Sequence, residues 1–71
     1  MKKISVIIAG RHSTSISLEE EFWIELQNIS KEKCLSINQL VTEIDSLREK
    51  ENLSSAIRIY ILRHLKNKKE E

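Results

Sequence analysis

The segment that decides the fold is STSISLEEEFW, residues 13–23. Its first six residues alternate, with serine at positions 13, 15 and 17 and a bulkier residue at positions 14, 16 and 18. A period of two residues is typical of a strand with one buried face. Three glutamates and the apolar pair Phe22–Trp23 follow, and the apolar spacing after them is helical. The sequence therefore predicts a short strand with a polar face directly before a set of helices.

A single strand in front of helices leaves a row of backbone N–H and C=O groups unpaired, which is costly. We expect the partner to be the same strand of a second copy, so that a homodimer forms through intermolecular antiparallel strands. The preceding residues 4–9 are also β-branched and strand-like, and Gly10 permits a turn after them. Two arrangements stay open for residues 4–9: a hairpin with residues 13–18, or an arm that pairs elsewhere in the dimer.

Three helices are expected after the strand. The first should begin near residues 17–19, with Ser17 as its N-cap, and end near residues 31–33. The second should begin at Ser36, because Gln39 follows at the spacing of a capping box. The third should run from residues 52–54 to about Asn67. It has apolar residues on two sides, which predicts one partner in its own domain and another in a second subunit.

The residues at strand or helix spacing define the expected core and the expected domain. We expect the dimer core to contain Ile16, Leu18, Phe22, Leu40, Ile44, Ile57 and Ile61. Asp45 and Arg58 should form a structural ion pair between the second and third helices. The chain should divide into an arm or extra strand at residues 1–11, a ribbon with three helices at residues 12–67, and a frayed tail at residues 68–71. The expected fold is mainly α with a β-ribbon.

Composition and charge limit the functional classes. The 71 residues form one small domain near the lower size at which a chain folds alone, so dimerisation is the expected source of extra buried area. The net charge is only +1, but all 11 acidic residues lie after residue 18. The acid-free beginning holds Lys2, Lys3 and Arg11. A basic stretch beside a strand is a candidate surface for phosphate.

The sequence lacks the patterns that are typical of enzymes, metal-binding proteins and membrane proteins. The sequence has no order of residues typical of a catalytic triad, no paired carboxylates and no glycine-rich phosphate loop. His12 and His64 stand without cysteine or acid at metal-ligand spacing. The single cysteine, Cys34, suits a reducing cytoplasm, and the apolar residues 4–9 are too few for a membrane span or a signal peptide. We expect a cytoplasmic protein that is not an enzyme and has no metal, cofactor or membrane partner.

The order strand, helix, short turn, helix resembles the ribbon-helix-helix family of bacterial DNA-binding proteins. The resemblance covers roughly residues 10–66 and rests on the motifs TSISLE at 14–19, Phe22–Trp23, Ile44–Asp45 and NLSSAIR at 52–58. These motifs are similar to a short alphaproteobacterial subgroup with a third helix. The resemblance implies a homodimeric transcriptional regulator whose paired strands enter the major groove of double-stranded DNA.

The resemblance also implies roles for single residues. The base contacts would fall on Ser13, Ser15 and Ser17. The family grips phosphate through backbone N–H groups at the start of its second helix, here near Ser36 and Asn38. Further expected phosphate contacts are Lys2, Lys3, Arg11 and His12. Where the family has a basic residue directly before Thr14, this chain has Ser13. We therefore expect weak discrimination between bases.

A second functional class stays open beside DNA binding. The chain could be a dimeric protein-interaction module, like an antitoxin or an adaptor, that docks a protein partner through its third helix or its N-terminal arm. The sequence also leaves open whether dimers pair further on DNA.

Overall fold

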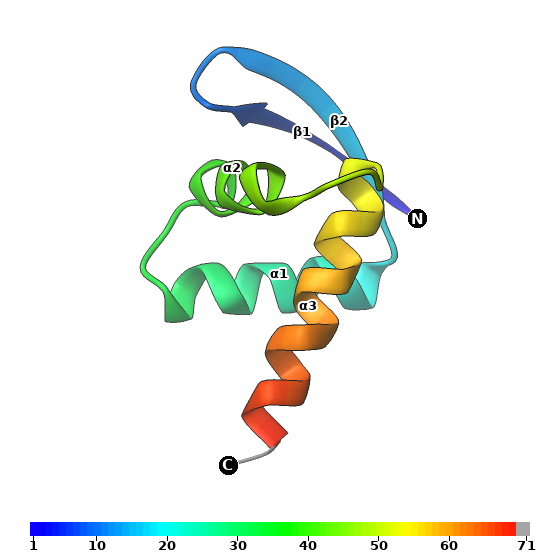
Figure 1. Ribbon diagram of the computed structural model, residues 1–71, viewed down its shortest axis with the longest axis vertical. Coiled ribbons are helices and arrows are strands. Elements are labelled where there is room, and N and C mark those ends of the chain that lie inside the picture. Colours follow the sequence, from blue (N-terminus) through cyan, green and yellow to red (C-terminus); the bar gives the residue numbers. More distant parts are fainter. Residues whose placement is uncertain (70–71) are drawn as a thin grey trace.

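The computed structural model describes the backbone through Lys69 and the side chains through residue 67. The element order is β1 (Lys2–Ile8), β2 (His12–Leu18), α1 (Glu20–Glu32), α2 (Ile37–Leu47) and α3 (Leu53–Lys69). The two strands lie over α2, α1 lies on the other side of α2, and the second half of α3 extends beyond α1 (Figure 1). The prediction of a mainly α chain with a β-ribbon and an added third helix is confirmed. Of the expected frayed tail, residues 70–71 lie outside the described residues.

The strand β2 is paired with β1 of the same chain. The two form an antiparallel hairpin whose register places Ile4 opposite Ile16 and Ser5 opposite Ser15. This is the hairpin that the sequence left open, and it corrects the expectation that β2 lacks a partner within its own chain. The physical reason is that residues 2–8 alternate as β2 does, so both strands bury one face on the same helices.

The turn of the hairpin is formed by residues 8–11. The Arg11 N–H donates to the Ile8 carbonyl at 3.1 Å, and the φ angles of Ala9 and Gly10 are 54° and 71°. Two successive positive φ angles are typical of a type I′ turn, whose twist matches that of hairpin strands. Glycine adopts this conformation without steric cost, whereas the Cβ of Ala9 is crowded there.

The helix starts follow the predictions in two of three places. At α2, the Ser36 hydroxyl accepts from the Gln39 N–H at 3.1 Å and the Gln39 side-chain oxygen accepts from the Ser36 N–H at 2.8 Å, which confirms the capping box. The third helix begins at Leu53, inside the predicted range. At α1 the prediction of Ser17 as N-cap is wrong. Ser17 belongs to β2, and Glu19 holds the cap position without a side-chain cap bond.

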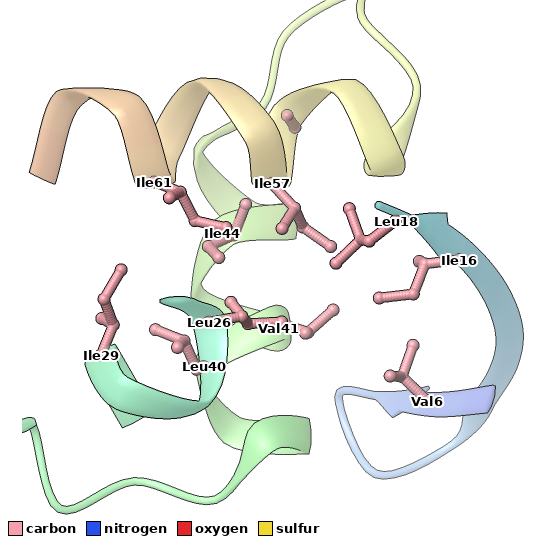
Figure 2. Close-up of a cluster of buried hydrophobic side chains, with 11 residues drawn as sticks. Val6, Ile16, Leu18, Leu26, Ile29, Leu40, Val41, Ile44, Ile57 and Ile61 are labelled. Atoms are coloured by element: carbon pink, nitrogen blue, oxygen red, sulfur yellow. The ribbon is translucent and has the colours of Figure 1, made fainter. Parts of the chain in front are cut away.

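One hydrophobic core lies between the ribbon and the helices. Figure 2 shows Val6, Ile16 and Leu18 pointing from the ribbon toward side chains of the helices. The predicted core residues are buried, except Phe22, which is partly buried against them. Ile16 and Leu18 are 1% and 0% exposed, so a single chain already covers them. That any of these residues contacts a second copy stays a prediction.

Candidate nucleic-acid interface

The ribbon has a buried face and an outward face. Three cross-strand pairs make up the outward face: Lys3 with Ser17, Ser5 with Ser15, and Ile7 with Ser13. Five of these six residues are exposed and Ser17 is partly exposed. The structure thus brings the three predicted base-contacting serines together on one surface. This surface of six residues is called the ribbon face below.

Half of the ribbon face comes from β1. Sequence reasoning assigned no base contact to Ser5 or Ile7, because residues 1–11 were expected to be an arm or an extra strand. The signal that could have found them is the alternation of Lys3, Ser5 and Ile7 with apolar residues at 4, 6 and 8. Such alternation places odd-numbered residues on one face of a strand.

Helices flank both edges of the ribbon. On the β1 edge, the Ile7 N–H donates to Asn38 Oδ1 at 3.1 Å and the Ala9 N–H donates to Thr42 Oγ1 at 3.0 Å. On the β2 edge, the Ser17 N–H donates to Ser54 Oγ at 3.2 Å. The ribbon is therefore fixed between the first half of α2 on one side and the start of α3 on the other.

These bonds show at which residues the backbone groups of the two outer edges are not bonded to a helix. In an antiparallel pair, successive residues direct their backbone groups alternately toward and away from the partner strand. Since Ile7 and Ser17 direct theirs to the helices, the odd-numbered residues of both strands point away from the hairpin partner. The open edge positions are consequently Lys3 and Ser5 on β1 and Ser13 and Ser15 on β2.

The predicted cationic contacts lie at the two ends of the ribbon. Lys2 and Lys3 stand at its open end, and Arg11 and His12 at its turn, all of them exposed. A strand of seven residues is roughly 20 Å long at about 3.3 Å per residue. Basic side chains therefore flank the serines at both ends.

The side chains of Ser36 and Asn38 have structural roles. The Ser36 hydroxyl is occupied by the capping box, and Asn38 Oδ1 binds the edge of β1. Together they fix the start of α2 beside the ribbon. The backbone N–H groups of Ile37 and Asn38 belong to the first turn of α2, where a helix has no internal acceptors for them. These N–H groups match the predicted phosphate grip better than the side chains do.

The acid nearest to the end of β2 is paired. Arg58 Nε donates to the Glu19 carboxylate at 2.8 Å, and this hydrogen bond is the main reason why the pKa of Glu19 is lowered. The predicted ion pair between Asp45 and Arg58 is wrong. Asp45 pairs with Arg48 at 2.6 Å instead, because Arg48 lies three residues away, next to the end of α2.

The histidine of α3 and the other possible metal ligands do not form a second site in the described part of the chain. His64 lies 3.0 Å from Glu32 and its ring stacks on Tyr60, far along α3 from the ribbon. Among the described residues, no three His, Cys, Asp or Glu side chains are grouped as metal ligands would be. None of the helices in the described part of the chain is long and apolar enough to cross a membrane.

Comparison with known proteins identifies the fold. The family model described as "Ribbon-helix-helix domain" matches residues 1–65 and therefore includes β1. Searches of curated proteins and of solved structures found no significant match. Proteins with this domain are generally DNA-binding regulators without enzymatic activity, and the fold generally binds DNA as a dimer. The chain belongs to the ribbon-helix-helix family.

Proposed function

We propose that the protein is a bacterial, cytoplasmic transcriptional regulator that lays its ribbon face in the major groove of duplex DNA. The observation that carries this proposal is the row of serines on β2 between basic residues at both ends of the ribbon. The major groove is about 12 Å wide and admits a two-stranded ribbon. Serine hydroxyls donate and accept, so Ser13, Ser15 and Ser17 can bond to the edges of several bases.

Phosphate contacts supply most of the affinity in this proposal. Lys2 and Lys3 reach the backbone at the open end of the ribbon, and Arg11 and His12 reach it at the turn. The N–H groups at the start of α2 add a contact beside β1, since helix starts favour anions. The pairing of Glu19 with Arg58 reduces the repulsion of phosphate near the end of β2.

The protein acts as a dimer in this proposal, and α3 supplies the contact. Joining two copies through β2 would give four strands spanning about 14 Å between the outer ones, wider than the groove. Helices also cover part of both edges. Ile59 and Leu62, one turn apart on α3, are 38% and 57% exposed and offer an apolar surface for the second copy.

Sedimentation velocity tests this assembly. The wild type is expected to sediment as a dimer at micromolar concentration, and Leu62→Glu as a monomer. Leu47→Glu is the matched control, because Leu47 is even more exposed, at 67%, but lies on α2. A monomeric wild type, or a dimer that survives Leu62→Glu, would refute the assembly through α3.

The DNA-binding proposal is tested by selecting bound duplexes from a random pool and measuring their affinity by fluorescence polarisation. The dissociation constant should rise steeply with salt, because several phosphates are neutralised. Arg11→Gln should weaken binding to all sequences and lower the salt slope by about one. Ser15→Ala should reduce base preference instead. Lys31→Gln, an exposed lysine of α1, is the control, and absence of binding at low salt would refute the proposal.

A further inference from the structure

We infer that β1 is a second reading strand and that Ile7 recognises the methyl group of a thymine in the major groove. The inference rests on the proposed DNA binding and names one of its base contacts. It concerns a residue outside the serine row and outside the segment 10–66 that carried the resemblance.

β1 is anchored both to the core and to α2. Val6 is 1% exposed and belongs to the core. The N–H groups of Ile7 and Ala9 are bonded to α2 at 3.1 and 3.0 Å. The outward side chains of β1 therefore have defined positions relative to the serines of β2, which is what a contact to one particular base requires.

Ile7 is the only large apolar side chain on the ribbon face. It is 46% exposed although Ile4, Val6 and Ile8 of the same strand turn toward the core. Its cross-strand neighbour is Ser13, and Ser5 precedes it on the same face. Both neighbours are small, so the isoleucine projects past them and reaches deeper into any groove that receives the ribbon.

An isoleucine can recognise only an apolar feature of a base edge. In the major groove that feature is the C5 methyl group of thymine, and the other groups there are hydrogen-bond donors and acceptors. Cross-strand neighbours have Cβ atoms about 5 Å apart. Ser13 and Ile7 would therefore read the same or adjacent base pairs, one through a hydroxyl and the other through apolar contact.

The surroundings of Ile7 suit this placement. Ile7 lines a surface hollow together with Gly10, Asn38 and Thr42, between the hairpin turn and the start of α2. Asn38, whose backbone N–H is expected to meet phosphate, is one of the residues that line the hollow. A contact between Ile7 and a base would thus lie beside the contact between a DNA phosphate and the start of α2.

Replacement of thymine by deoxyuracil in the selected duplex tests the inference, because it removes only the C5 methyl group. One replacement should weaken binding of the wild type about fourfold, the value of burying one methyl-sized group. Ile7→Ser should bind the two duplexes equally, and Ile7→Val should keep the discrimination. Ile24→Ser is the matched control, because Ile24 is 50% exposed but lies on α1.

The outcomes separate the inference from the proposed function. If the wild type binds selected duplexes but no deoxyuracil replacement weakens binding, or if Ile7→Ser still discriminates, the role of Ile7 is refuted and DNA binding stands. If the wild type binds no duplex at low salt, the proposed function itself is refuted. The comparison of the two duplexes with the wild type needs no variant, so a folding defect of Ile7→Ser does not compromise it.

Discussion

Arg58 of α3 donates a hydrogen bond from Nε to the carboxylate of Glu19, 39 positions earlier in the chain, at 2.8 Å. Its Nη2 also donates to the carbonyl of Ser17 at 3.1 Å. One guanidinium therefore fastens the third helix to the end of β2 and to the start of α1. Together with the bond from the Ser17 N–H to Ser54 Oγ, this contact fixes the end of the ribbon relative to α3.

Arg58→Ala is expected to lower the free energy of unfolding by about 1 kcal/mol, the usual net value of a protein hydrogen bond, because the Ser17 carbonyl loses its donor. The partly exposed ion pair with Glu19 adds little. Urea denaturation followed by circular dichroism measures the change. Arg63→Ala serves as the control, since Arg63 is exposed on the same helix, and an equal loss in both variants would contradict a specific role of Arg58.

Acid should weaken the same contact. The hydrogen bond from Arg58 lowers the pKa of Glu19 in the folded chain below its unfolded value. A group of this kind stabilises the fold above its unfolded pKa, near 4.3 for glutamate, and the contribution is lost as pH falls through the folded pKa.

The urea midpoint of the wild type should therefore fall more steeply below about pH 5 than that of Glu19→Gln. The effect should be small because the carboxylate is exposed to solvent screening. In Arg58→Ala the carboxylate lacks its partner, so this variant should resemble Glu19→Gln in its pH profile. Parallel profiles of the wild type and Glu19→Gln would rule out the linkage.

The turn of the hairpin predicts that substitutions at its two central residues differ in their effect on stability. Gly10→Ala should cost about 1 kcal/mol, because φ is 71° there and an added Cβ meets no atom within 4 Å, so the loss is conformational only. Ala9→Gly should be neutral or stabilise by up to about 1 kcal/mol, because Ala9 already holds a φ of 54°. Thermal unfolding of both variants measures this, and effects of the same sign would contradict the turn geometry.

Features that depend on a few neighbouring residues could be predicted from the sequence. The capping box of Ser36 and Gln39 needs only their spacing, and the apolar period of α2 needs only eleven consecutive residues. The buried face of β2 followed from its alternation in the same way. These predictions hold because each depends on backbone periodicity and not on how distant elements meet.

Features that depend on tertiary contacts were not predictable in this way. Ala9–Gly10 is a weak hairpin signal compared with Asn-Gly, so the turn between the strands could not be chosen over an arm. Arg58 was expected to meet Asp45, but the fold brings it to Glu19, and Asp45 takes the nearer Arg48. The pairing of Lys3, Ser5 and Ile7 with the serines of β2 depends on a register that only the folded hairpin shows.

The end of α1 predicts a stabilising substitution at the single cysteine. The Leu35 N–H donates to the Ser30 carbonyl at 2.9 Å and the Cys34 N–H donates to the Lys31 carbonyl at 3.2 Å, which is the bond pattern of a Schellman motif. Cys34 stands at the position that usually holds glycine, with a φ of 57°. Its side chain is exposed and makes no disulfide among the described residues.

Cys34→Gly is expected to raise the free energy of unfolding by about 1 kcal/mol, because glycine holds a positive φ without steric cost. Cys34→Ala separates the backbone effect from the loss of the thiol, since alanine keeps the Cβ, and it should leave stability nearly unchanged. Cys34→Val should destabilise, because a β-branched residue tolerates this conformation worst. Urea denaturation under reducing conditions gives the order, and a gain in Cys34→Ala equal to that in Cys34→Gly would place the strain in the thiol and not in the backbone.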